Sequence, residues 1–310
     1  MSNNIHGVGD LDSGNKKTEE LYYNQDDNTP IYSKFNYKGD PRFQTIPSFL
    51  KDLICPFFHF KSFSFIVIVI NVVIYIGSLI PYGLDDSYLD QDFLPPSSET
   101  LKYGYLYGYK IRNSFSQSFR WISGNFLHSH FSHIFGNCFF ILVIGTMVEY
   151  LIGTWKYMAI YILSGILGSL FSVLIEPHTK SVGASISICG LIAAYLAFIF
   201  INWNAIDRIF GVKNKCATIM FPLIMVFMSI PFPLVNGMAN ERINVYGHLG
   251  GFLLGFFLSF IFIKPKEPTD VACFTYNWLF TAGIIACSIF TILGLFLFYY
   301  LDKYKIKPDY

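Results

Sequence analysis

Seven long apolar segments dominate the pattern of hydrophobic and polar positions in this chain of 310 residues. A helix that crosses a bilayer needs about 20 mostly apolar residues in a row, and each segment comes close to that length. They cover, roughly, residues 62–82, 132–152, 157–176, 184–202, 216–234, 244–263 and 275–300. The pattern predicts an all-α polytopic membrane protein lying in the lipid bilayer, with no soluble second domain and no fixed-period repeat.

The polar stretches around these segments divide the chain into three parts. Residues 1–60 are polar and show neither a secretory signal peptide nor an Arg-rich transit peptide, so we expect a cytosolic, largely disordered tail. Residues 61–265 contain the first six apolar segments and are expected to form a six-helix core. Residues 266–310 are expected to add a seventh transmembrane helix and a short tail.

Composition supports this class and narrows the partners. Hydrophobic residues make up 53% of the chain and charged residues 14%, whereas a soluble domain carries about 25% charged residues. The net charge of +1 argues against nucleic acid as a partner. The six cysteines form no CxxC pair, which predicts neither a disulfide framework nor a metal site.

Lysine and arginine in the short loops predict the orientation, since they concentrate on the cytosolic side of a membrane. Three polar stretches carry most of them: the one before the first apolar segment, the one after the fourth and the one after the sixth. All three belong on one side, which places the N-terminus in the cytosol. One group dissents, because Lys303, Lys305 and Lys307 fall on the outer side if all seven segments span.

Ser185 and His248 stand at the start of the fourth and sixth apolar segments. Both segments run from outside to inside, so the two residues share a depth near the outer surface. An ionisable side chain within the membrane is a functional candidate, and a serine needs a base such as histidine to become a nucleophile. No Asp or Glu lies in the apolar parts of the fourth to sixth segments, so these residues predict a Ser–His dyad and hydrolysis within the membrane.

The second segment supplies further polar groups. His133 and Asn137 are i,i+4 neighbours on one helix face, with His128 just upstream. Their N–H groups could donate to a developing oxyanion; the alternative is a hydrogen-bonded pair between helices. The histidines lack an HExxH pattern and a nearby carboxylate, so no metal is expected.

Gly247, Gly251 and Gly255 form a small-xxx-small stripe beside His248. Such a stripe lets two backbones approach closely. It predicts that the sixth helix is pressed against the fourth, near Ser185 and Gly190. Ordinary packing of small residues without chemistry is the alternative reading of the stripe alone.

Together these features resemble the rhomboid intramembrane serine protease family over about residues 119–256. The residues that match family motifs, in chain order, are Phe119-Arg120 (Trp-Arg in the family), His128, His133, Asn137, Glu149 with Gly153 (E-x-x-x-G), Gly183-Ala184-Ser185, His248-Leu249-Gly250-Gly251 and Gly255. The resemblance implies a six-helix rhomboid-type bundle with an additional C-terminal seventh transmembrane helix. Secretory-pathway members share that order, so it implies the secretory pathway or plasma membrane and argues against mitochondria.

The resemblance also implies roles. Ser185 would be the nucleophile, His248 the general base, and His133, Asn137 and the Ser185 backbone N–H the oxyanion site. Supporting residues would be Arg120, His128, Glu149, Gly183, Gly251 and Gly255. No cofactor is implied. The substrates implied are single-pass membrane proteins, cut in or near their transmembrane helix.

Two positions depart from the family pattern, and two rival functions stay open. Ile186 stands where Gly is common, so its bulk is expected to narrow the pocket, and Cys189 stands where many members place an aromatic that packs on the histidine.

The fifth helix and the loop at 235–243 are expected to form a gate and cap. The rivals are a catalytically inactive relative that binds membrane clients and, less favoured, a transporter with intramembrane polar residues.

Overall fold

The computed structural model describes residues 57–87, 89, 93–210, 215–229, 243–266 and 270–301. Across these ranges the chain is helical, and its β-type pairing is limited to two isolated bridges, Leu84 with Pro96 and Leu106 with Ser181. The long helices are α3 (Phe63–Ser78), α7 (Phe131–Phe140), η4 (Ile141–Gly145), α8 (Thr146–Ile152), α9 (Thr154–Ile175), α10 (Ser185–Ile201), α12 (Lys215–Ser229), α14 (Val245–Phe262) and α15 (Asp270–Tyr300). Each predicted apolar segment overlaps one of these helices or the run α7–η4–α8, and the all-α polytopic architecture is confirmed. The end of the fifth segment, residues 230–234, lies outside the described residues.

Within the described residues, four helices are long and apolar enough to cross a membrane: Phe131–Ile152, Thr154–Ile175, Val245–Phe262 and Phe274–Tyr300. A fifth span is formed if α10 and the following Trp203–Phe210, bent from it by 75°, count as one. Two further apolar helices, Phe63–Ser78 and Thr218–Phe227, are shorter. The chain is therefore an integral membrane protein. Helix α3 ends before the predicted limit because the chain approaches Pro81, and a residue before proline avoids helical backbone angles.

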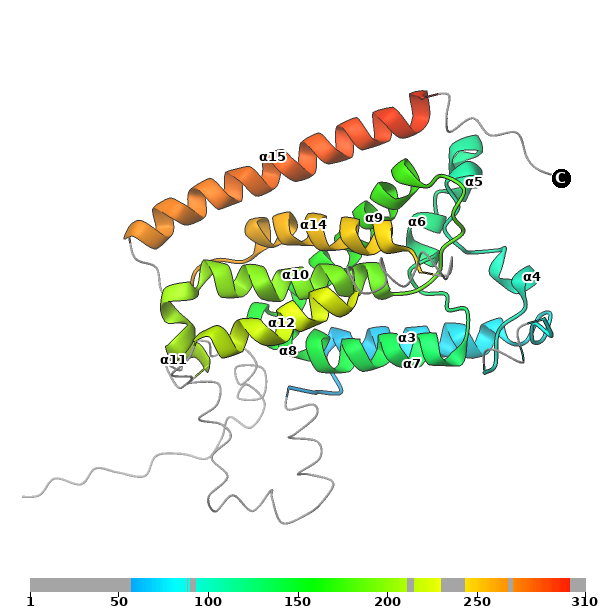
Figure 1. Cartoon of the computed structure of the whole chain (residues 1–310), viewed down its shortest axis with the longest axis horizontal. Helices are drawn as coiled ribbons and strands as arrows, with labels where there is room; N and C mark the ends of the chain where they lie inside the picture. The colour runs from blue at the N-terminus through cyan, green and yellow to red at the C-terminus, as the bar shows by residue number, and fades with distance from the viewer. Residues whose placement is uncertain are drawn as a thin grey trace, which may run out of the picture.

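The centre of the bundle is built from α9, α10 and α14, each in contact with the other two. In Figure 1, α3 and α7 lie side by side along one edge, and α15 runs along the opposite edge beside α14. The main core includes the fully buried Tyr157, Tyr161, Leu191 and Phe198. A second, smaller apolar cluster joins the first loop to α9 and α15 through Leu106, Ile111, Leu170, Val173 and Phe298. The polar clusters lie at the two ends of the bundle.

The run α7–η4–α8 contains a wide π-helical turn over Ile141–Gly145. A side chain at Gly145 would come within 2.8 Å of the Tyr157 hydroxyl oxygen, so the turn brings its backbone against that ring. Gly153 then reverses the chain into α9 with φ +88°, an angle that favours glycine. The sequence predicted this segment as one helix, and the extra backbone of the π turn is a local departure within it.

The first loop contains the short helices α4 (Ser98–Leu101), α5 (Gly108–Asn113), η3 (Phe115–Gln117) and α6 (Arg120–Ser123). Arg120 is buried and donates to Gln117 Oε1 at 2.7 Å, and to the carbonyls of Tyr105 at 2.9 Å and Lys102 at 3.0 Å. These bonds hold distant parts of the loop together, because one guanidinium can serve several acceptors at once.

The first loop also holds the far end of α15. Arg112 donates to the carbonyls of Tyr299 and Leu301 at 2.7 and 2.6 Å, and the rings of Trp121 and Phe298 pack edge to face, 5.5 Å apart. Carbonyls at a helix C-terminus lack intrahelical donors, and a cation there is favourable. The seventh helix therefore ends on the same side of the bundle as the first loop. Lys303, Lys305 and Lys307 lie outside the described residues.

Candidate active site

Ser185 and His248 meet at the end of the bundle that carries the first loop, which we call the dyad end. Ser185 opens α10 and His248 lies in the first turn of α14. The Ser185 Oγ and His248 Nε2 atoms are 2.7 Å apart, in a partly buried setting. With the histidine proton placed on Nδ1, the serine hydroxyl donates to Nε2. This is the geometry that a general base needs to take the serine proton.

Glycines let α10 and α14 approach closely enough for this bond. A Cβ at Gly251 would collide with the backbone carbonyl oxygen of Ile186, and one at Gly255 would lie 2.5 Å from the Cα of Gly190. Real Cβ atoms are not found that close to other heavy atoms. The contact that the glycine stripe predicts between the two helices is confirmed, and it lies directly below the dyad.

Ile186, whose bulk was expected to narrow the pocket, packs between helices. Its side chain is buried against Gly168 of α9 and against Gly247 and Gly251 of α14, and it is not among the residues that line the cavity described below. Glycines on two neighbouring helices make room for its branched side chain. Cys189, one turn further along α10, is also buried.

Gly183 sits between the nucleophile and the second-segment polar groups. Its φ of +124° favours glycine. A Cβ there would lie 2.6 Å from His133 Nε2 and 3.4 Å from Asn137 Nδ2. His133 and Asn137 therefore face the turn that carries Ser185, as the sequence placed them. The turn itself is held by the first loop, since the Gly183 N–H donates to the Gly124 carbonyl at 2.9 Å.

The donors in this group are available for a further partner. The buried Asn137 Nδ2 has no hydrogen-bond partner among the described residues. His133 Nδ1 lies 3.1 Å from Ser129 Oγ, so a serine hydroxyl that donates to Nδ1 leaves the proton on Nε2, facing Gly183. His133 Nε2 is therefore a second N–H donor directed at the same turn.

His128 lies behind His133, with ring centroids 5.1 Å apart. Its Nδ1 is 3.2 Å from the Phe126 carbonyl, and burial lowers the pKa of His128 to about 4. It is therefore neutral at physiological pH and supports the ring of His133 by packing. Across the described ranges, no group of three His, Cys, Asp or Glu side chains is arranged to hold a metal.

A cavity of about 320 Å³ adjoins this group at the dyad end. His133 and Ser129 form part of its wall, next to the Gly183 turn. The other lining residues come from the first loop and from the ends of the helices: Asp85, Pro95, Pro96, Ser98, Leu101, Tyr105, His130, Thr179, Lys180, Ser181, Val182 and Asn244. The cavity is large enough for several side chains of a bound peptide, and both polar and apolar residues face it.

Asn244 is a polar residue of this region that the sequence reasoning missed. It is buried, caps the first turn of α14 through a 2.7 Å bond from the Gly247 N–H, and bonds to Ser172 and Ser181. An Asn directly before an apolar helix is a common start signal. That signal identifies the cap, although it does not identify the two serines.

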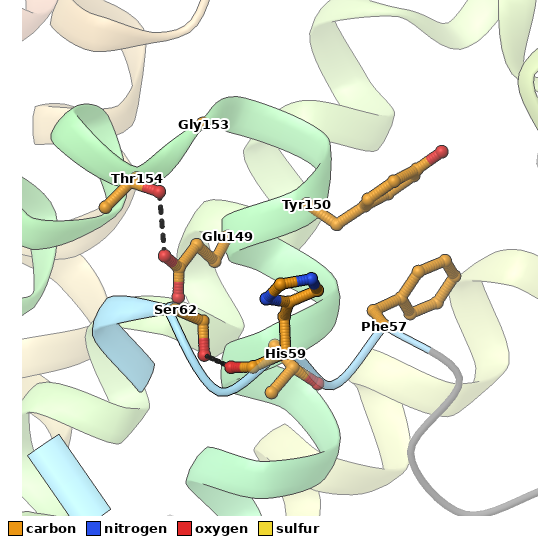
Figure 2. A pocket seen from close by; sticks show the side chains of 8 residues that line it. Phe57, His59, Ser62, Glu149, Tyr150, Gly153 and Thr154 are labelled. Carbon is orange, nitrogen blue, oxygen red and sulfur yellow. Dashed lines mark hydrogen bonds between the residues drawn. The ribbon is translucent and has the colours of Figure 1, made fainter. Parts of the chain in front are cut away.

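Glu149 is not part of this group. It lies at the other end of the bundle, sixteen residues after His133 along the run α7–α8, or about 24 Å along a helix axis. Figure 2 shows its carboxylate bonded to Thr154, beside Ser62, His59 and Gly153. The carboxylate also accepts from the Phe63 and Ser64 backbone N–H groups. Arg120, in the first loop, likewise makes its bonds within the loop.

Comparison with known proteins identifies the family. A model of the Rhomboid domain matches residues 116–265. Rhomboid-like protease 1 of Toxoplasma gondii is 27% identical over 268 residues, which cover 84% of this chain and 85% of that protein. RHOMBOID-like protein 7 of Arabidopsis thaliana is 30% identical over 228 residues, covering 67% and 70%, and Inactive RHOMBOID-like protein 8 of the same plant is 32% identical over 165 residues, covering 53% and 44%. The chain belongs to the rhomboid family.

Proposed function

We propose that this protein is an intramembrane serine endopeptidase that cuts the transmembrane helices of single-pass membrane proteins with a Ser185–His248 dyad. The observation that carries the proposal is the 2.7 Å contact between Ser185 Oγ and His248 Nε2. It brings together the two residue types that nucleophilic catalysis requires, from helices 63 residues apart in the chain. The cavity of about 320 Å³, lined by His133 and by Ser181 and Val182 of the segment before Ser185, offers room for a peptide next to the dyad.

The proposed reaction has two halves. His248 takes the proton of Ser185 as its oxygen attacks the scissile carbonyl carbon, and then gives that proton to the leaving amine. An ester of the substrate with Ser185 remains. A water molecule, activated by the same histidine, attacks the ester, and the peptide acid and free Ser185 are released.

Three donors would stabilise the oxyanion of each tetrahedral intermediate. The Asn137 Nδ2 group has no partner among the described residues, His133 Nε2 faces the same turn, and the N–H of Ser185 belongs to the first turn of α10. The first N–H groups of a helix have no intrahelical acceptor and point toward an incoming anion. Preorganised donors of this kind usually make the largest electrostatic contribution to acyl transfer.

The proposal also covers the route of substrate entry and the location of the protein in the cell. We infer that substrate enters beside α12, which packs on α10 and contains Pro222 within its helix. The expected cap at 235–243 lies outside the described residues, apart from Ile243. By the lysine pattern and helix order, the N-terminus is cytosolic and the protein belongs to the secretory pathway or plasma membrane rather than to mitochondria.

Coexpression with a panel of single-pass membrane proteins tests the function. Wild type is expected to release fragments of at least one panel member, and Ser185→Ala to release none. Ser187→Ala is the matched control, because Ser187 is a buried serine on the same helix that faces Gly165 of α9. If no panel member is cut, and binding persists in wild type and Ser185→Ala alike, the client-binding alternative is favoured. Solute flux that depends on His133 would favour the transporter.

A further inference from the structure

We infer that Asn244 is a positioning residue that holds His248 within reach of Ser185, an inference that rests on the proposed function. Asn244 lies directly before α14 and is buried. Its single carboxamide connects the helix of the base, the neighbouring helix α9 and the segment that leads into the nucleophile. The sequence identifies it only as a helix cap, and none of the catalytic motifs includes it.

The first connection fixes the turn that carries the base. The side-chain oxygen of Asn244 accepts the Gly247 N–H at 2.7 Å, and its backbone carbonyl accepts the His248 N–H at 3.1 Å. A side-chain oxygen at this position satisfies a helix N–H that otherwise has no partner. The backbone of His248 is thus tied, directly and through its neighbour, to one residue.

The second connection joins that turn to the nucleophile. Asn244 Nδ2 donates to Ser181 Oγ at 3.0 Å, four residues before Ser185. Ser181 is itself fixed, since its N–H and carbonyl exchange hydrogen bonds of 3.0 and 2.8 Å with Leu106 of the first loop. The carboxamide therefore spans the gap between the segments that carry the two reacting side chains.

The third connection fixes the position of α14 along its axis relative to α9. Ser172 Oγ donates to Asn244 Oδ1 at 2.8 Å, and both residues are buried. With this bond, Oδ1 accepts two hydrogen bonds and Nδ2 donates one. An alanine at 244 would remove all three and leave buried polar groups without partners, which costs more than the bonds themselves contribute. The first turn of α14 would be expected to shift.

A small shift matters because the dyad has little tolerance. The Ser185–His248 contact is 2.7 Å, and proton transfer needs a heavy-atom distance of about 2.6–3.2 Å. The margin is about half an ångström on that scale. A misplacement of about 1 Å can lower a catalytic rate by about 10²-fold.

Asn202 provides a matched control at the opposite end of the same helix pair. It is buried, donates to the Phe198 carbonyl at 2.9 Å, and accepts the Lys266 N–H at 2.6 Å. It therefore ties the end of α10 to the chain that follows α14, as Asn244 ties their beginnings. Loss of Asn202 should weaken the fold without moving the dyad.

The test is the rate at which a fluorophosphonate probe labels the full chain in detergent, measured together with the melting temperature. Asn244→Ala is expected to lower the maximal labelling rate by about 10–10²-fold with little change in probe concentration at half-saturation. Asn244→Ser, which restores an oxygen for the Gly247 N–H, should recover part of the rate. Asn202→Ala should lower the melting temperature and keep the wild-type rate.

Three results would overturn the inference. The first is labelling of Asn244→Ala at the wild-type rate. The second is labelling of Asn202→Ala that is slowed as much as that of Asn244→Ala when both variants lose the same melting temperature. If Asn244→Ala does not fold, Ser181→Ala removes one bond alone, and its labelling at the wild-type rate counts against the inference. Failure of the proposed function looks different: wild type itself would then show no labelling that depends on Ser185, and both claims would fall.

Discussion

The two ends of the bundle carry polar clusters of opposite character. At one end, the two carboxylate oxygens of Glu149 accept four hydrogen bonds, from the Phe63 and Ser64 N–H groups, the Ser64 hydroxyl and the Thr154 hydroxyl, at 2.6–2.8 Å. At the other end, Ser185 and His248 share one bond, and the neighbouring Asn137 Nδ2 has no partner among the described residues. The carboxylate of the first cluster has all its oxygens hydrogen-bonded, whereas the second cluster keeps a donor available for a further partner.

This difference in hydrogen bonding indicates that the Glu149 cluster stabilises the fold and that the dyad end carries the chemistry. A buried carboxylate is stable only when its oxygens are bonded, and placement at the start of α3 adds the favourable field of a helix N-terminus. Glu149 thereby ties α8 to α3 and α9. A catalytic group must instead meet charge that exists only during the reaction, so its donors stay unpaired until then. Substitutions at the two ends should accordingly affect different quantities.

The largest effect is expected for His248→Ala. Without the base, cleavage of a substrate in proteoliposomes should fall by about 10⁴-fold or more, while the melting temperature in detergent stays near that of wild type. Cleavage within tenfold of wild type, at equal protein level, would place the essential base elsewhere.

Gly251→Ala should lower both stability and activity, whereas the other substitutions affect mainly one of the two. Its Cβ would collide with the Ile186 carbonyl, so the helices must separate, and both melting temperature and activity should fall, the latter by about 10²-fold. Gly77→Ala is the control, because a Cβ at Gly77 meets no other atom within 4 Å. Equal behaviour of the two variants would mean that the α10–α14 contact is loose.

Asn137→Ala and His133→Ala should weaken turnover less than loss of the dyad. Removing one oxyanion donor costs about 10²–10³-fold in a soluble protease, and with three donors proposed here we expect about tenfold for each variant and more for the double variant. kcat should fall and KM should stay. If the double variant retains full activity, the assignment of the second helix is wrong.

Glu149→Gln should have the reverse signature. A glutamine offers one carbonyl oxygen and a donor in place of two acceptors, so at least one buried N–H or hydroxyl loses its partner. We expect the free energy of unfolding to fall by about 3 kcal/mol, while the labelling rate of folded protein by a fluorophosphonate is unchanged. If folded Glu149→Gln protein is labelled more slowly than wild type, the Glu149 cluster also affects the reactivity of Ser185.

The smallest effect is expected for Arg112→Ala, which frees the end of α15 from the first loop. Loss of the C-terminal cap should cost about 1 kcal/mol, and activity should change little because Phe298 remains buried against the loop. Cysteine cross-linking between the first loop and the end of α15 would report the release. Unchanged cross-linking would show that the ring contacts alone hold the helix.

The sequence predicted the helices and the shared depth of Ser185 and His248, because apolar length and helix direction are local properties. It also predicted the close approach of α14 to α10, since the glycine stripe is visible in sequence. It did not predict the bond from Asn244 to Ser181 or the pairing of Ser181 with Leu106. Those contacts join residues 63 and 75 positions apart, and hydrogen-bonding residues in loops carry no periodic signal of their partners.

Ile186 shows why bulk alone is a poor guide. From the sequence its bulk was expected to narrow the pocket, but the direction of its side chain depends on how α10 is rotated. That rotation is set by Gly168 and Gly247 on two other helices. The π turn at Ile141–Gly145 also escaped prediction. Its Gly145 lies against the Tyr157 hydroxyl of the neighbouring helix, a contact that the local sequence does not reveal.

The central claim is that the dyad end of the bundle contains an activated serine. The most direct test is peptide mapping by mass spectrometry after the full chain in detergent reacts with a fluorophosphonate. We predict one adduct on Ser185, absent when His248 is replaced by alanine, and none on Ser187 or on the serines around Glu149. A folded wild-type protein without an adduct on Ser185, or with an adduct that persists in His248→Ala, would contradict it.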